Sequence, residues 1–333
     1  MNLSDDKKKA YKRSMWRSQG LAMLFVVPFV LFFVLYTLVP LIMGVGLSFF
    51  DYNPNKPGEM SFVGFLNYAD MFGTTNEKLE ITFVKPFWES LLNTILFDLI
   101  AVPLLMVIPL LLAHLINYQP PGYKFFRAVL YMPVIVSITV AGMMFTSIFG
   151  ESSTGLINGW LGTHIKFLTD TGWRWVVMIL LSVWWQTGTN FVIFSAGLRD
   201  IPKSLYEACE ADGGGKSSKF FHVTLPGLKG QIDLCLFSTL INYLNLYGQP
   251  SVIRGSAIYD TMYDSPMMLI QNSLKVLPRW TGFICAMAVV FGLIVLAFSI
   301  VEKRLMGKEK GGHGYEKTFA AFKSVQKLSL IHI

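Results

Sequence analysis

Six long apolar stretches restrict the fold of this 333-residue chain more than any other feature. Most contain the roughly 20 residues that a helix needs to cross a bilayer, and the fifth is only marginally long enough. None contains Lys or Arg, and their only acidic residues are Asp98 and the border residue Asp233. We therefore expect an all-α polytopic membrane protein with six transmembrane helices. The stretches are residues 21–47, 91–116, 128–149, 175–198, 232–247 and 281–301.

Basic residues near the stretch ends predict which side of the membrane each loop faces, because Lys and Arg are retained on the cytoplasmic side. They are dense in the N-terminal tail, in the second and fourth connections and at the C-terminal end, and sparse in the other loops. Both termini are therefore expected in the cytoplasm. Attraction to anionic lipid headgroups accounts for the net charge of +7 without a nucleic-acid partner.

Three segments are expected along the chain. They are a basic cytoplasmic tail at residues 1–19, a transmembrane domain at residues 20–306 and a C-terminal tail at residues 307–333. The last six residues, LSLIHI, resemble a translated transposon end from sequencing-library preparation and are expected to be artefactual. Prolines inside the stretches predict kinked helices. The three cysteines are too scattered for a disulfide framework or a metal site.

The cytoplasmic loop at residues 200–229 predicts two helical pieces joined by a flexible turn. Pro202 is well placed to open a helix, and residues 204–212 are mostly good helix formers. The glycines at 213–215 should stop this helix, because glycine tolerates the left-handed conformation that ends helices. Residues 217–224 then form a second piece that presents two phenylalanines.

The same loop contains the sequence ADGGGKSS, which is similar to the second half of a nucleotide-binding P-loop. The complete motif requires a glycine where Glu210 stands, and it follows a buried strand rather than a helix. We therefore expect no bound nucleotide, no catalytic residue and no resident cofactor or metal in this chain.

The loop resembles the EAA loop, E-A-A-x3-G-x9-I-x-L-P, of the membrane permease subunits of binding-protein-dependent ABC importers. Cys209 replaces the second alanine of that motif, and Val223 replaces its isoleucine. The segments FVGFLNYADMF, WESLLNT and GLRDIP are similar to the sugar-permease branch that is related to the maltose and multiple-sugar transporters. The remaining fixed positions of the motif are occupied by Glu207, Ala208, Gly213, Leu225 and Pro226.

The resemblance implies a permease subunit of an ATP-driven carbohydrate uptake system in a bacterial plasma membrane. Its implied partners are a second permease subunit, two ATP-binding subunits, an extracytoplasmic solute-binding protein and a sugar. ATP would be bound and hydrolysed by the partner subunits. The alternative is a stand-alone secondary transporter or channel for a neutral polar solute, which has no need of an EAA-type loop.

In that family the loop is a coupling helix that sits in a groove of the ATPase subunit. Glu207 would pair with a basic group there, Ala208 would permit close approach, and Gly213 would supply the turn. The competing interpretation is a simple surface hairpin. The implied coupling residues are Glu207, Ala208, Cys209, Asp212, Gly213, Val223, Leu225 and Pro226.

Amide and aromatic side chains in the fourth and fifth stretches are candidates for the substrate pathway, because polar groups within a membrane face a pore or a neighbouring helix. Amides exchange hydrogen bonds with hydroxyls, and aromatic faces cover sugar rings. Each residue can instead form an interhelical hydrogen bond. The same bond is expected of Asp98 in the second stretch, and a role in a proton relay is its alternative. The candidates are Trp184, Gln186, Asn190, Asn242, Tyr243, Asn245 and Tyr247.

Overall fold

A computed structural model describes residues 23–24, 26–74, 76–151, 155–253 and 265–307 of the chain. The predicted tail at residues 1–19, the C-terminal residues 308–333 and the outer-loop residues 254–264 lie outside the described part. The chain divides into two compact units, which are described separately. The N-terminal unit is Met1–Thr74 with Ser273–Val290, and the main unit is Thr75–Asn272 with Phe291–Ile333.

The N-terminal unit contains one long apolar helix, Val26–Leu47, followed by a short hairpin. Asn67 is buried, and its Nδ2 donates hydrogen bonds to the Ser48 and Phe50 carbonyls, at 2.9 and 3.1 Å, which fixes the chain after the helix. This small antiparallel sheet is an exception within a described chain that is otherwise mostly helical, as the sequence predicted. The elements are η1 (Val34–Leu38), α2 (Val39–Leu47), β1 (Phe50–Asp51), η2 (Pro57–Glu59), β2 (Ser61–Phe62), α3 (Leu66–Asp70), η5 (Pro278–Trp280) and the first part of α16 (Thr281–Gly307).

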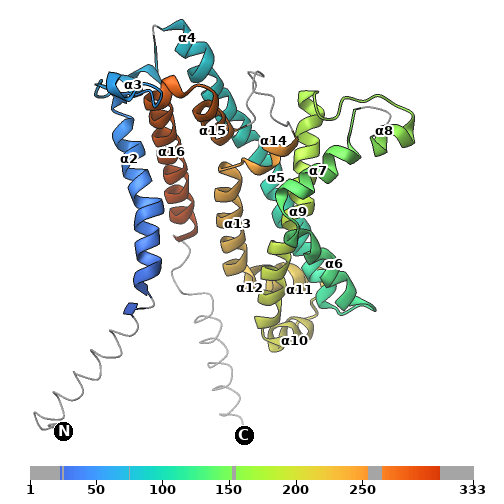
Figure 1. Cartoon of the computed structure of the whole chain (residues 1–333). Helices are drawn as coiled ribbons and strands as arrows, with labels where there is room; N and C mark the ends of the chain where they lie inside the picture. The colour runs from blue at the N-terminus through green and yellow to red at the C-terminus, as the bar shows by residue number, and fades with distance from the viewer. Residues whose placement is uncertain (1–22, 25, 75, 152–154, 254–264, 308–333) are drawn as a thin grey trace, which may run out of the picture. The chain divides into compact units, whose positions relative to one another are not determined.

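The main unit is helical and is built around α5 (Lys85–Asn117), α9 (Thr171–Asp200) and α13 (Lys229–Leu244), which pack against one another (Figure 1). α4 (Glu77–Leu79) and η3 (Glu80–Val84) extend α5 into one helix. The other elements are α6 (Tyr123–Ile135), α7 (Ile138–Ile148), α8 (Leu156–Leu161), α10 (Lys203–Ala211), α11 (Lys216–Lys219), η4 (Phe220–Thr224), α12 (Leu225–Gly227) and α14 (Gly248–Ile253), with most of α15 (Pro266–Val276) and the later part of α16.

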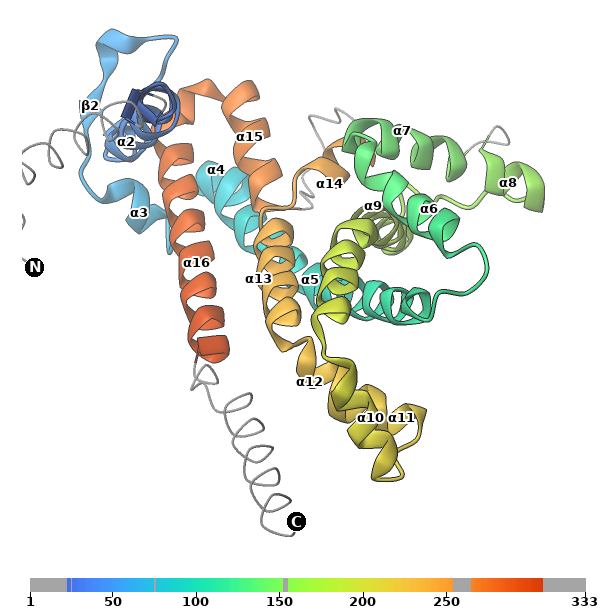
Figure 2. The same cartoon turned by 90° about the horizontal axis from the view of Figure 1, so that it is seen from below.

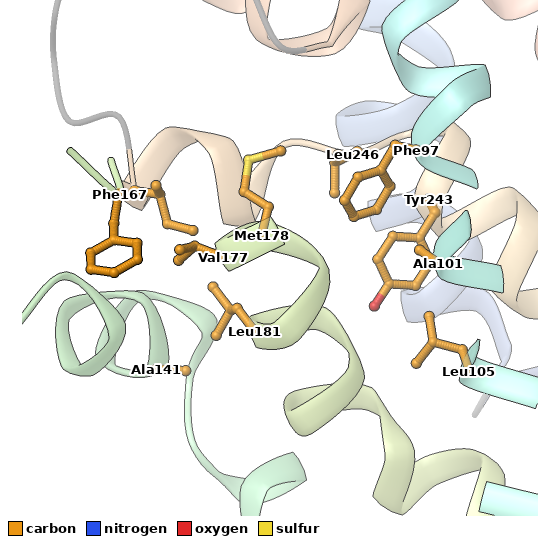
Figure 3. Packing of buried hydrophobic residues seen from close by; sticks show 11 residues of the cluster. Phe97, Ala101, Leu105, Ala141, Phe167, Val177, Met178, Leu181, Tyr243 and Leu246 are labelled. Carbon is orange, nitrogen blue, oxygen red and sulfur yellow. The ribbon is translucent and has the colours of Figure 1, made fainter. Parts of the chain in front are cut away.

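Buried apolar side chains hold these helices together. Phe97 of α5 lies beside Tyr243 of α13, with ring centroids 5.8 Å apart, while Met178 and Leu181 of α9 belong to the same cluster (Figure 3). All four side chains are at most 3% exposed. The cluster therefore fixes the three central helices against one another without any covalent link.

Four described helices are long and apolar enough to cross a membrane, by length and composition: Val26–Leu47, Glu77–Asn117, Gly172–Asp200 and Pro278–Arg304. They correspond to the first, second, fourth and sixth predicted spans. The fifth predicted span is the 16-residue α13, which is short for a crossing. The number six and the cytoplasmic location of both termini stay predictions.

The third predicted span is not a single helix. α6 and α7 meet at an angle of 101°, because Val136 and Ser137 adopt extended conformations between them. Pro133 has no N–H to continue the helical ladder, and the Ser137 hydroxyl accepts a hydrogen bond from the Val140 N–H at 3.3 Å, starting a new helix. The predicted kinking at prolines is therefore strongest here, and it produces either a broken span or a re-entrant loop.

Candidate functional site: a helical hairpin and a polar cavity

The loop predicted to form two helical pieces does form a hairpin, which we define as residues 203–227. α10 begins after Pro202 and ends at Asp212, and Gly213 has φ +79°. The Gly214 N–H donates a hydrogen bond to the Cys209 carbonyl at 2.8 Å, which closes the end of α10. The second piece is continuous from α11 through η4 and α12, longer than the sequence predicted. Figures 1 and 2 show this hairpin at the ends of α9 and α13.

Three side-chain contacts join the halves of the hairpin, and one of them lies between Cys209 Sγ and the Ser218 hydroxyl at 3.6 Å. The Tyr206 hydroxyl lies 3.0 Å from the Thr224 hydroxyl, and Lys219 Nζ donates a hydrogen bond of 2.8 Å to Glu210 Oε2. The hydrogen bond from Lys219, and then its charge, hold the pKa of Glu210 below its ordinary value. The hairpin is therefore a coherent element rather than two independent helices.

The inner side of the hairpin packs on the long helices. Leu205, Tyr206 and Val223 contact a buried cluster that includes Phe194 of α9 and Leu228, which precedes α13. This contact ties the hairpin to the ends of those helices. A movement of the hairpin would consequently displace α9 and α13 as well.

An aromatic contact also joins the hairpin to α5. The Phe220 ring lies edge-to-face on the His114 ring, with centroids 4.8 Å apart, and His114 Nε2 lies 3.1 Å from the Tyr118 hydroxyl. His114 and Tyr118 both belong to the cytoplasmic end predicted for the second span. The hairpin thus contacts all three central helices.

The predicted coupling residues fall into two groups in the structure. The exposed group could meet another protein, and it consists of Glu207, Ala208, Asp212, Gly213 and Pro226. The half-buried group consists of Cys209, Val223 and Leu225, of which Val223 packs against the buried cluster of the long helices. The hairpin therefore presents its acidic and small residues outward together with Phe221, which is 59% exposed, while Leu205 and Val223 pack toward the helices.

A second candidate site is a cavity of about 290 Å³ in the main unit, which we call the polar cavity. It contains five of the seven predicted pathway residues, namely Gln186, Asn242, Tyr243, Asn245 and Tyr247. α9 supplies the first of these, and α13 with the residues directly after it supplies the others. Packing between α9 and α13 thus brings together amides and phenols that are distant in the sequence.

The other two predicted pathway residues lie outside the polar cavity. Asn190 is fully buried, and its Nδ2 donates hydrogen bonds to the Leu105 carbonyl at 2.8 Å and to the Thr239 hydroxyl at 3.2 Å. It thereby links α9 to α5 and α13, which is the interhelical role that the sequence left open. Trp184 packs against Phe145 of α7, with ring centroids 5.8 Å apart.

Five lining residues were not predicted from the sequence, and Leu246 and Gly248 are two of them. Trp185 lines it and also donates a hydrogen bond of 2.8 Å from Nε1 to the Val136 carbonyl at the break between α6 and α7. Gln249 lies in α14, beyond the fifth apolar stretch, and Ile138 comes from α7. For Gln249, the only local sequence signal was the GQP segment at the start of α14, which places a polar residue directly after the fifth apolar stretch.

Among the residues that the structure describes, those that line the polar cavity include no charged side chain. Its polar groups are amides and hydroxyls, which donate and accept hydrogen bonds without a net charge. Trp185 and Tyr243 supply apolar ring surface. Such a lining suits a neutral molecule with several hydroxyl groups. The described residues also hold no group of three or more His, Cys, Asp or Glu side chains that could bind a metal ion.

The expectation for Asp98 is wrong. Neither of its carboxylate oxygens has a hydrogen-bond partner, although the side chain is only 5% exposed. Asp98 faces a different cavity, together with Glu302 of α16. Among the residues that the structure describes, none donates a hydrogen bond to this carboxylate.

Comparisons with known proteins agree with this arrangement of helices. Residues 82–307 match the family described as "Binding-protein-dependent transport system inner membrane component". The arabinooligosaccharides transport system permease protein AraP of Bacillus subtilis is 30% identical over 320 residues, which are 91% of this chain and 95% of that protein. The sulfoquinovosyl glycerol transport system permease protein SmoG of Agrobacterium fabrum is 29% identical over 308 residues, covering 90% and 96% of the two chains.

A solved structure has the same fold. It is a bacterial ABC transporter involved in the import of the acidic polysaccharide alginate, and it aligns with a TM-score of 0.69 over 91% of this chain and 99% of that chain. The sequence identity is 21%. This similarity therefore concerns the fold alone.

Proposed function

Since this chain belongs to the family of inner membrane components of binding-protein-dependent transport systems, we propose that it forms the translocation pathway of an ATP-driven carbohydrate importer. The chain is an ABC importer permease and a multi-pass membrane protein, not an enzyme. Carbohydrate is the proposed substrate class because the relatives AraP and SmoG are named for sugar-containing substrates. The bacterial plasma membrane is the proposed location.

The polar cavity is the observation that carries the substrate assignment. Gln186, Asn242 and Asn245 would exchange hydrogen bonds with sugar hydroxyls, and the rings of Trp185 and Tyr247 would cover the apolar face of a sugar ring. A carboxylated sugar would find no cation among the lining residues. A neutral saccharide therefore fits this cavity better than an acidic one.

Uptake by the assembled transporter tests this assignment. Asn242→Leu should raise KM for a neutral oligosaccharide about fivefold, since one hydrogen bond to a hydroxyl contributes about 1 kcal/mol. Asn117→Leu, at the exposed end of α5 and outside the cavity, is the matched control. Equal kinetics for the two variants, or preferred uptake of acidic sugars, would contradict a neutral-saccharide pathway.

The hairpin at residues 203–227 is the proposed contact with a separate ATPase subunit. Its exposed group, which includes Glu207 and Gly213, would lie in a groove of that subunit, and its half-buried group would pass the movement to the long helices. The contact between Phe220 and His114 would pass the same movement to α5. ATP would be bound and hydrolysed only on the partner subunits.

Two variants test the coupling proposal. Glu207→Lys reverses a charge on the exposed side of α10, and Gly213→Trp puts a bulky residue at a left-handed position. Both should abolish uptake while leaving membrane insertion intact. The control is Glu77→Lys, which reverses an exposed charge outside the hairpin. A transporter with this variant should take up sugar normally. Normal uptake by Glu207→Lys and Gly213→Trp would overturn the assignment.

The remaining proposed partners follow from the family's description as binding-protein-dependent. They are a second permease subunit, two ATP-binding subunits and an extracytoplasmic solute-binding protein. A solved relative of the same fold is a bacterial alginate ABC transporter in complex with a periplasmic protein bound to an alginate pentasaccharide. We propose an equivalent receptor on the outer side of this chain.

A further inference from the structure

Two carboxylates on different helices line one cavity that has no role in the proposed substrate pathway or in the proposed coupling to the ATPase. The cavity has a volume of about 300 Å³ and lies between α5, α13 and the later part of α16, all in the main unit. Within the described part of the chain, Asp98 of α5 and Glu302 of α16 are its only ionisable lining residues. The other lining side chains are apolar. We call this space the acidic cavity.

The carboxylates of the acidic cavity are not satisfied by the part of the chain that the structure describes. Both Asp98 oxygens and the Glu302 Oε1 are buried without a hydrogen-bond partner. Asp98 is 5% exposed and lies inside the second apolar stretch. Ionisable groups at such depth are costly and usually pair with a group of opposite charge. The arrangement therefore calls for a positively charged occupant.

A bare metal ion fits this cavity poorly. Calcium takes six to eight oxygen ligands and magnesium requires six, whereas the lining offers two carboxylates among residues such as Leu99, Val102 and Leu240. A lysine or arginine side chain fits better, because its aliphatic stem can lie along apolar surface while its charged end reaches a carboxylate. The mixed lining therefore favours a basic side chain.

This side chain cannot come from the spans of a second copy of the chain. None of the six apolar stretches contains Lys or Arg. A second copy would instead bring its own Asp98 and Glu302, and like charges within a low-dielectric region repel. A basic residue inside a membrane span would consequently come from a different membrane protein.

We infer that the acidic cavity docks a lysine or arginine side chain from a transmembrane helix of a second, non-identical permease subunit. This inference rests on the proposed function, since that function requires a paired permease, and it specifies the pair as heteromeric. The Asp98 and Glu302 carboxylates would accept the hydrogen bonds of the basic group, and Leu99 and Val102 would pack along its stem. The pairing would also exclude assembly of two copies of this chain.

Photocrosslinking in the intact transporter tests the docking. A benzoylphenylalanine at position 99, which lines the cavity and is 71% exposed, is activated in membranes that contain the complete system. The expected adduct joins position 99 to a transmembrane peptide of a non-identical chain that contains Lys or Arg. Its yield should fall at least about tenfold in the Asp98→Asn/Glu302→Gln double variant.

Asp233→Asn is the matched control, because Asp233 is an acid on α13 that does not line the acidic cavity. This variant should keep the full adduct yield. An adduct between two copies of this chain would overturn the inference, as would an adduct whose yield is unchanged in the double variant. If the Asp98→Asn/Glu302→Gln double variant assembles and takes up sugar normally, the proposed permease function still holds. The docking inference and the proposed function can therefore fail independently of each other.

A carbodiimide provides a second measurement that does not depend on a variant. Dicyclohexylcarbodiimide takes the proton of a neutral carboxylic acid and forms a bond to its oxygen, so an ionised, ion-paired carboxylate in the membrane is spared. Asp98 should be modified in the chain expressed alone and protected in the assembled transporter. Equal modification in both samples, detected by mass spectrometry, would show that no cation pairs with Asp98.

Discussion

The three consecutive glycines of the hairpin turn have different structural requirements. Gly213 has φ +79° and open space around its Cα, so its backbone conformation is the constraint. A Cβ at Gly214 would lie 2.5 Å from Cys209 Sγ and 2.6 Å from the Cys209 carbonyl oxygen, so space is the constraint there. Gly215 has neither restriction. Only the first two positions therefore require glycine.

Alanine substitutions should separate these requirements. Gly213→Ala places an L-residue in the left-handed region at a cost of about 1–2 kcal/mol, and Gly214→Ala forces the backbone away from Cys209. Both should accelerate amide hydrogen exchange in α10 and slow uptake. Gly215→Ala is the matched control and should change neither measurement. Equal exchange in all three variants would contradict these distinct roles.

The ion pair between Glu210 and Lys219 predicts a dependence on pH. Since the folded-state pKa of Glu210 is lowered, the pair stabilises the hairpin above the ordinary carboxyl pKa and loses its effect as the pH falls through the folded-state value. Lys219→Gln should raise the pKa of Glu210, measured by NMR titration of its carboxyl carbon. Lys216→Gln, a neighbouring exposed lysine, should leave it unchanged.

At the scale of elements, the break between α6 and α7 influences which side chains line the polar cavity. The break exposes the Val136 carbonyl, and Trp185 Nε1 of α9 donates a hydrogen bond to it. The same Trp185 lines the cavity beside Ile138 of α7. One side chain therefore both satisfies the broken helix and shapes the proposed pathway.

Removing this indole N–H should loosen the break. Trp185→Phe keeps an aromatic ring but leaves the Val136 carbonyl without its donor, at a cost of about 1–3 kcal/mol. We expect a lower midpoint of thermal unfolding in detergent and faster amide exchange at residues 134–140. Trp184→Phe, which can keep the ring contact with Phe145, is the control. If the midpoint of thermal unfolding is unchanged in Trp185→Phe, the hydrogen bond from Trp185 to the Val136 carbonyl does not stabilise the break.

At the scale of the whole molecule, the predicted topology places the hairpin in the cytoplasm and α8 on the opposite side. Native Cys209 is half-buried in the hairpin, and Trp160 of α8 is 87% exposed. A membrane-impermeant maleimide should label Cys209 only in inverted vesicles, whereas it should label Trp160→Cys only in right-side-out cells. Labelling of both residues from one side would contradict the predicted arrangement.

The assignment of ATP to partner subunits also concerns the whole molecule. Glu210 occupies the position where a P-loop requires glycine, and it is bonded to Lys219. The purified chain should therefore bind no ATP in equilibrium dialysis, and vesicles containing it alone should not accumulate sugar. Uptake without the ATPase subunits would support the stand-alone transporter instead.

The sequence was sufficient to predict the features that depend on residues adjacent in the chain. The apolar stretches predicted the long helices, since a helix of roughly 20 apolar residues is stable in a bilayer whatever surrounds it. Pro202 and Gly213 likewise predicted the limits of α10, because each acts through its own backbone dihedral angles. The EAA-type motif at residues 207–226 could be recognised from the sequence for the same reason, because all its fixed positions lie within one short segment.

Only the tertiary structure decided which polar groups meet. Asn190 and Gln186 lie one turn apart on the same face of α9, yet one links helices and the other lines the polar cavity, since they meet different neighbours along the helix. Asp98 and Glu302 are distant in sequence and share a cavity through helix packing. Such convergence depends on the register and crossing of whole helices, which apolar side chains set collectively. The sequence by itself thus determined the kind of protein and four of its long helices, while packing decided the walls of both cavities.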